Sequence, residues 1–270
     1  AVAYALMTRI DIAVFVCALQ RVTHKPSIIH VKRLNAVLRW MQAHPKRISF
    51  RNMSRDTHLR CVGDAAFRKE ETDGRSLRGA VFLRSAVVGT GSSSAERTNS
   101  ASSSGTGGSY AKRTYAIDNT GGDRSVEPSG DKSNFLKTCN VHIIDAICKS
   151  QRHVTRSTFS SELLSACDTI DHGMLLALTL HELKHGVQSS ASCRSLRETG
   201  GWDVKLGLYV DAMSVYAAVT ATFLKIPAEK SLLSHVQYVR ELLDTKVLEA
   251  LIWIDTRDMC ADGLTKGSVD

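Results

Sequence analysis

The seven cysteines of this sequence include no CxxC pair, and their number is odd. Disulfide frameworks of secreted domains use an even number of cysteines at close spacings, and cysteine zinc sites use paired ones. The scattered pattern therefore argues against a disulfide framework and against a cysteine-based zinc site. It indicates a reducing compartment, so we expect an intracellular protein that is not secreted.

The start of the chain also lacks a membrane-spanning run and a secretory signal. The apolar stretch IAVFVCAL, residues 12–19, is too short to cross a bilayer and is flanked by Arg9, Asp11, Gln20 and Arg21. The basic start and small-residue cleavage site of a signal peptide are missing. We interpret the stretch as a core helix and expect no membrane association. The chain begins AVAYALMTRID without an initiator Met, which leads us to expect a fragment of a longer polyprotein or a partial gene model.

The composition is that of a chain with a substantial core and a basic surface. Hydrophobic residues make up 43% of the 270 residues, the formal net charge is +8 and the pI is about 9.2. This length suits one large domain or two small ones. The positive charge favours acidic partners, with nucleic acid first among them.

Apolar periodicity and turn residues predict a chain that mixes helices and strands. A long helix is expected from Ser157 or Thr158 to about residue 187, either continuous or broken near Gly173. Further helices are expected at residues 11–21, 28–43, 213–225, 228–245 and 259–267. Strands are expected at residues 47–52, 58–67, 77–88, 141–149, 205–211 and 248–255.

One stretch differs in composition from the rest of the chain. Ser, Gly, Thr and Asn dominate from about residue 89 to about residue 134. Such a segment cannot bury enough apolar surface to order itself. We expect a disordered insertion in a loop.

Four acidic residues lie in apolar surroundings, and three of these surroundings favour buried strand or helix segments. They are Asp64 in CVGDAAF, Glu162 in STFSSELL, Asp211 in LGLYVDAMSV and Asp262 in DMCADGLTK. An unpaired buried carboxylate is costly, but several can be kept if they converge on a divalent cation. Hard oxygen ligands around one or two magnesium ions are the usual arrangement for cutting phosphodiesters. The four acids are therefore the candidate catalytic and metal-binding residues.

The segments around these acids resemble copia-type retrotransposon Pol polyproteins, in the C-terminal part. The stretches that carry the resemblance are GDAAFRKEETDGRSLRGAVFL, KSQRHVTRSTFSSELLSA, LGLYVDAMSVYA and IDTRDMCADGLTKG, preceded by YALMTRIDIAVFVCALQRV and HVKRLNAVLRWMQAHP. The resemblance implies that residues 1–55 are the end of the reverse transcriptase, a short helical connection segment. It implies that residues 56–270 form an RNase H domain, an α/β ribonuclease H-like fold with a mixed central sheet flanked by helices.

The resemblance also implies an activity. An RNase H of this family hydrolyses the RNA strand of RNA–DNA hybrids during reverse transcription, with Mg²⁺ (or Mn²⁺) as cofactor. Asp64 would bridge two ions, Glu162 and Asp211 would hold one, and Asp262 would hold the other more loosely. The implied partners are the hybrid and a missing upstream polymerase domain of the same polyprotein. The implied location is a cytoplasmic particle or the nucleus.

Two alternatives stay open at this point. The first is a catalytically inactive descendant that binds nucleic acid without cutting it. It is favoured by Ala212, which follows Asp211 where the family has Asn, and by the low-complexity insertion.

The second alternative is a zinc metalloprotease. HELKH, residues 181–185, matches the HExxH pattern, in which His181 and His185 would bind zinc and Glu182 would be the general base. The extended motif needs Gly three and His six residues after the second His, but Gln188 and Ala191 occupy those places. Glu198 is the acid shortly downstream that could replace it.

Overall fold

Strands from distant parts of the chain form one mixed sheet. The computed structural model describes residues 2–6, 8–50, 52–53, 56–67, 75–86, 141–152, 154–223 and 227–266. The Ser/Gly-rich stretch expected to be a disordered insertion lies outside these residues. The strands are β1 (Thr57–Ala66), β2 (Leu77–Ala86), β3 (Val141–Ser150), β4 (Val204–Val210) and β5 (Ala250–Trp253). Each lies within about two residues of a strand expected from the sequence.

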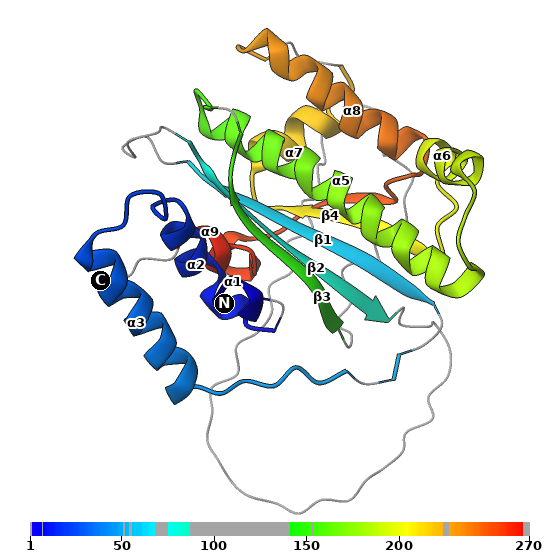
Figure 1. The fold of residues 1–270 in the computed structure, drawn as a ribbon. Coiled ribbons are helices and arrows are strands. Elements are labelled where there is room, and N and C mark those ends of the chain that lie inside the picture. The colour runs from blue at the N-terminus through cyan, green and yellow to red at the C-terminus, as the bar shows by residue number, and fades with distance from the viewer. Residues whose placement is uncertain are drawn as a thin grey trace, which may run out of the picture.

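The strand order is β3-β2-β1-β4-β5. β2 runs antiparallel to both β1 and β3, whereas β4 runs parallel to both β1 and β5. Parallel neighbours need a crossover connection. The long connection from β3 to β4 contains a helix of 28 residues, α5 (Thr158–His185), which lies across one face of the sheet (Figure 1).

Helices cover the α5 face of the sheet and enclose the main core. Beside α5 lie α7 (Met213–Thr220) and α8 (Leu233–Asp244), which follows a 3₁₀ turn at Lys230–Leu232. Leu59 and Cys61 of β1 point into this core, where they meet Leu163 and Ile170 of α5. The alternation of strand side chains sends Val62 to the opposite face.

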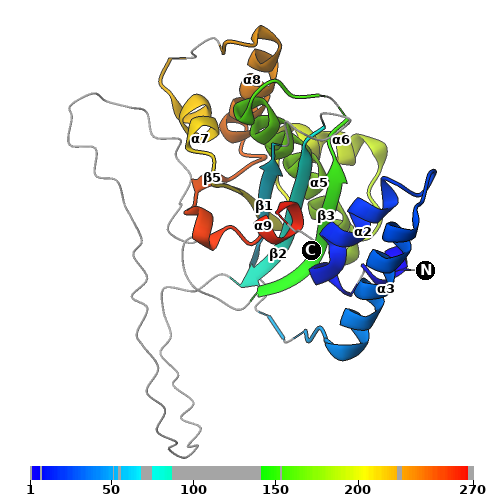
Figure 2. The same ribbon diagram turned by 90° about the vertical axis from the view of Figure 1, so that its left-hand side faces the viewer.

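The N-terminal helices and the C-terminal helix cover that opposite face (Figure 2). They are α1 (Val2–Ala5), the 3₁₀ turn Ile10–Ile12, α2 (Ala13–Gln20), α3 (Ile28–Ala43) and α9 (Asp262–Thr265). Ala13 of α2 and Leu264 of α9 share one apolar cluster with Val62 and Tyr209 of the sheet. α2 therefore packs directly on the sheet, and α3 packs on α2 through Val37.

An ion pair fixes the start of these N-terminal helices. The Arg9 guanidinium donates to both carboxylate oxygens of Asp11 at 2.9 Å, and it reaches the Met41 carbonyl of α3. The hydrogen bond from Arg9 lowers the pKa of Asp11 to about 2. Arg9 thus connects the turn before α2 to the end of α3.

α3 exposes most of its apolar side chains. Val37 is its one buried residue, while Ile28 is 77% exposed and Trp40 is 49% exposed. Ile29, Val31 and Leu38 are exposed as well. Several exposed apolar side chains on one helix are more than a free surface usually carries and favour contact with another domain.

Three details differ from the sequence prediction. The strand expected at residues 47–52 is wrong for its described residues 47–50 and 52, which are neither helix nor strand. Phe50 is 63% exposed there, and a segment without a neighbour to pair with does not form a strand however high its propensity. An unpredicted helix, α6 (Ser190–Thr199), has Ser189 as its N-cap and Gly200 at its C-terminal end.

The helix expected at residues 213–225 ends earlier, at Thr220. Arg240 of α8 donates to the Ala221 carbonyl at 2.7 Å, which satisfies an acceptor at the helix end. The helix expected from Ser157 or Thr158 is confirmed as a single one, which passes through Gly173 without a break.

By length and composition, α5 could span a membrane, and it is the one such helix in the described part of the chain. Half of its most apolar window is buried inside the protein, where it forms the main core against β1 and β4.

Candidate metal centre

Three of the four expected acids converge. Asp64, Glu162 and Asp211 each offer a carboxylate oxygen within 4.8 Å of the others. Asp64 is 1% exposed, and Glu162 and Asp211 are partly buried. The structure thus brings together residues that lie 147 positions apart in the sequence at most.

The sheet accounts for the meeting of Asp64 and Asp211. β1 and β4 are parallel neighbours, with Val62 opposite Tyr209. Asp64 therefore follows two residues after this pair on β1, and Asp211 follows two residues after it on β4. The carboxyl ends of parallel strands lie at the same sheet edge. Glu162 comes from the second turn of α5, the helix that begins after its N-cap Ser157.

Two glycines allow helices to approach the sheet closely at this edge. A Cβ on Gly63 of β1 would lie 2.6 Å from Thr169 Oγ1 of α5. A Cβ on Gly79, the partner of Asp64 on β2, would lie 2.8 Å from Thr265 Cγ2 and from Leu264 Cβ of α9. Any larger residue at either position would push a helix away from Asp64.

Hydrogen bonds hold Asp64 from both faces of the sheet. Thr265 Oγ1 of α9 donates to Asp64 Oδ2 in a short bond. On the α5 side, Ser165 Oγ donates to the Asp64 backbone carbonyl at 2.9 Å. Thr265 engages one carboxylate oxygen, which leaves a second oxygen of Asp64 for a cation.

Asp262 lies beside the group of three rather than within it. It is the first residue of α9, and Lys266 Nζ donates to Asp262 Oδ1 at 2.6 Å. The charges of Asp262 and of Lys266 both act on Asp64. The expected fourth acid is therefore adjacent to the cluster, paired with a lysine one helical turn away.

Burial raises the pKa of two carboxylates in this cluster, Asp64 and Glu162. Burial, with the charges of Asp64 and Asp211, raises the pKa of Glu162 to about 9. Burial also raises the pKa of Asp64 to about 6, although the hydrogen bond from Thr265 and the charge of Lys266 lower it. Close carboxylates away from water cannot all ionise without a compensating positive charge.

The donor set fits a hard divalent cation. Magnesium and manganese prefer carboxylate oxygens, and three of them converge here from three different elements. A cation would compensate the burial and the mutual repulsion that raise the pKa of Glu162 and of Asp64. The residues present thus suit the cofactor expected from the sequence.

The HELKH segment lies far from these acids, at the other end of α5. Asp203, just before β4, offers a carboxylate oxygen within 4.8 Å of nitrogens of His181 and His185. Glu182 Oε1 instead accepts a hydrogen bond from the Gln188 backbone N–H beyond the helix end. Its carboxylate is engaged in closing the helix, and Glu198 is exposed on α6.

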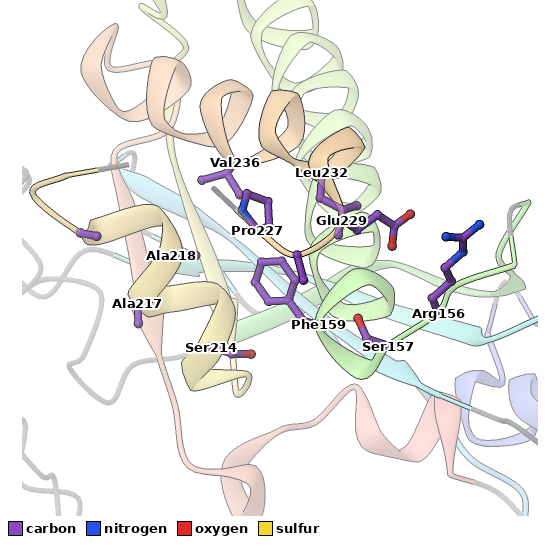
Figure 3. Close-up of a pocket in the computed structure, with 12 residues that line it drawn as sticks. Arg156, Ser157, Phe159, Ser214, Ala217, Ala218, Pro227, Glu229, Leu232 and Val236 are labelled. Atoms are coloured by element: carbon purple, nitrogen blue, oxygen red, sulfur yellow. The ribbon is translucent and has the colours of Figure 1, made fainter. Parts of the chain in front are cut away.

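An apolar hollow of about 700 Å³ lies between the start of α5, α7 and α8 (Figure 3). Phe159 lies in its centre, and Arg156 and Glu229 stand at its rim. Its other lining residues are Ser157, Ser214, Ala217, Ala218, Ala221, Pro227, Ala228, Leu232 and Val236. None of the three converging acids lines it, so it is separate from the metal centre.

Comparisons with family models, with curated protein sequences and with solved structures found no match. The assignment of function therefore rests on the geometry of the site and on the sequence patterns.

Sequence reasoning missed residues that support the site. Thr265 and Lys266 stand three and four positions after Asp262, a helical spacing that could have indicated their proximity. Ser165 and Asp203 carry no such signal, because each acts on a residue far away in the chain.

Proposed function

We propose that this chain is a divalent-metal nuclease of the ribonuclease H type, which hydrolyses the RNA strand of RNA–DNA hybrids. The observation that carries the proposal is the convergence of Asp64, Glu162 and Asp211 at one edge of a mixed sheet. Converging carboxylates from separate elements, one buried and two partly buried, are typical of the magnesium sites of phosphodiester-cleaving enzymes.

The architecture supports a ribonuclease H-like fold. Three antiparallel strands lead into two parallel ones in the order β3-β2-β1-β4-β5. The positions of the acids also support it: Asp64 lies on the first strand, Glu162 on α5, Asp211 directly after β4 and Asp262 on α9, the last helix.

Asp64, Glu162 and Asp211 would hold the metal, and Asp262 would assist from α9. Magnesium or manganese, when bound, supplies an activated water and stabilises the leaving 3′ oxygen. Thr265 keeps Asp64 oriented through its hydrogen bond. Glu162, whose pKa is raised to about 9, would release its proton when it becomes a ligand.

The rest of the chain is suited to a polyanionic substrate. The net charge of +8 provides a sequence-independent attraction to phosphates. Discrimination of RNA from DNA would come from contacts to the 2′-hydroxyl in the minor groove. Binding is therefore expected to weaken as the salt concentration rises.

The exposed apolar face of α3 supports a second element of the proposal, a partner domain. Its exposed side chains include Ile28, Ile29 and Trp40. We propose that an upstream polymerase domain of the same polyprotein covers this face.

A cleavage assay on a labelled RNA–DNA hybrid tests the proposal. Asp64→Asn and Asp211→Asn should each abolish magnesium-dependent cleavage, while Asp262→Asn should reduce it less, because Asp262 lies outside the converging three. Asp258→Asn is the matched control, since Asp258 is exposed on the neighbouring turn. Full cleavage by Asp64→Asn would refute the metal assignment.

The same assay addresses the inactive-descendant alternative, which rests on Ala212 beside Asp211. Such a protein would bind the hybrid in a salt-dependent manner and cleave nothing in magnesium or manganese. Restoration of cleavage by Ala212→Asn would trace the loss of activity to that position.

A further inference from the structure

A second cluster of metal-ligating side chains lies at the opposite end of β4 from the acids. His181 and His185 stand one turn apart near the C-terminus of α5, and Asp203 directly precedes β4. Asp211 directly follows the same strand, so the two clusters are roughly 25 Å apart at about 3.3 Å per residue. The second cluster is therefore independent of the proposed nuclease site.

The three side chains point their ligand atoms at one another. Asp203 Oδ2 lies 2.7 Å from His185 Nε2 and 3.4 Å from His181 Nδ1. The two imidazole rings lie 4.6 Å apart, centre to centre. Zinc bonds of about 2.0–2.2 Å in a tetrahedron place ligand atoms roughly 3.3–3.5 Å apart. Small shifts of these side chains would meet that requirement.

Hydrogen bonds do not satisfy every buried polar atom of this cluster. His181 Nδ1 and Asp203 Oδ2 are both buried; His181 Nδ1 has no hydrogen-bond partner among the described residues, and Asp203 Oδ2 meets the His185 ring nitrogen at 2.7 Å. Buried polar atoms without a partner are rare and costly. A cation between them would satisfy His181 Nδ1 and would share Asp203 Oδ2 with the two imidazoles.

The surroundings of Asp203 suit a ligand that is already oriented. Lys184 Nζ donates to Asp203 Oδ1 at 2.9 Å. This bond engages one carboxylate oxygen and leaves Oδ2 for the cluster. Hydrogen bonds to the second atom of a ligating group typically orient it.

We propose that His181, His185 and Asp203 form a zinc site, with water at the fourth position. Two imidazoles and one carboxylate are a zinc donor set. The role is structural, because Glu182, the residue that HExxH chemistry uses as base, is held by the Gln188 backbone.

The site would tether the free end of α5. The fully buried residues of α5 end at Ala177, and in its last two turns Leu180 is only partly buried against the core. Leu183 there is 79% exposed. Zinc would join these turns to the start of β4, which pairs with β1 from Thr57 opposite Val204.

Calorimetric titration of the full chain with Zn²⁺ tests this proposal, in an Asp64→Asn background so that the acidic cluster does not contribute. One zinc ion should bind per chain. His181→Ala, His185→Ala and Asp203→Asn should each weaken binding at least about tenfold. His24→Ala and Glu198→Gln are matched controls that should bind zinc unchanged.

Two further readouts separate ligand loss from misfolding and from cysteine sites. Far-UV circular dichroism of each variant without zinc should match that of the parent, and zinc should raise the melting temperature of the parent but not of His185→Ala. The Co²⁺ complex should lack a thiolate charge-transfer band. Absence of a zinc site, undiminished affinity in Asp203→Asn, or a thiolate band would each overturn the assignment, and none of them bears on hybrid cleavage.

Discussion

Neutralising Glu162 should stabilise the metal-free protein while it removes a metal ligand. An unfolded glutamate has a pKa near 4.3, whereas burial beside Asp64 and Asp211 raises the pKa of Glu162 to about 9. The folded state thus binds a proton that the unfolded state has released between about pH 4 and pH 9. The free energy of unfolding therefore falls as pH rises through this window, because the unfolded state binds fewer protons.

The raised pKa sets the size of the effect. At pH 8 the proton linkage of Glu162 alone has an upper bound of about 5 kcal/mol. The neighbouring acids share this proton affinity, so we expect Glu162→Gln to stabilise the metal-free protein by about 2–4 kcal/mol at pH 8. The gain should shrink to nearly zero at pH 4, where glutamate is protonated in both states.

Urea unfolding in the presence of a chelator, followed by circular dichroism from pH 4 to pH 8.5, measures this difference. Glu241→Gln is the matched control, because Glu241 is exposed on α8 and should show no pH-dependent gain. Saturating magnesium should stabilise the parent more than Glu162→Gln, since only the parent retains the carboxylate. An equal difference at pH 5 and pH 8 would refute the reasoning.

The remaining predictions concern the contacts that hold the site and the N-terminal helices. Gly79→Ala should lower hybrid cleavage at least about tenfold by displacing α9 from Asp64, whereas Gly263→Ala, which meets nothing within 4 Å, should leave cleavage intact. Lys266→Met should raise the pKa of Asp64 in the metal-free protein above about 6, because the Lys266 charge lowers that pKa. Carboxyl ¹³C NMR titration of Asp64 measures this change. Asp11→Asn should lower the melting temperature at neutral pH. This loss should vanish as pH falls towards about 2, where the parent carboxylate is itself protonated. A constant loss across this range would show that the Arg9 ion pair is not its cause.

Local patterns in the sequence determined most of the secondary structure. The strand of Asp64, the cap at Ser157 and the apolar periodicity of α3 and α8 are local signals, so these elements were predicted to within a few residues. The failures at residues 47–52 and at the end of α7 share one physical reason. Residues 47–50 lack a strand to pair with, and α7 ends where Arg240 of another helix takes up the Ala221 carbonyl. Neither fact is encoded within the segment itself.

The sequence by itself also determined which acids to consider, because a carboxylate in an apolar frame needs compensation. Tertiary structure alone decided that Asp64, Glu162 and Asp211 converge while Asp262 lies beside them with Lys266. It likewise chose Asp203, rather than Glu198, as the carboxylate beside His181 and His185. The physical reason is the same at both ends of β4. Ligand sets depend on which strand ends and helix turns share a sheet edge, and that follows from strand pairing and close helix packing rather than from spacing along the chain.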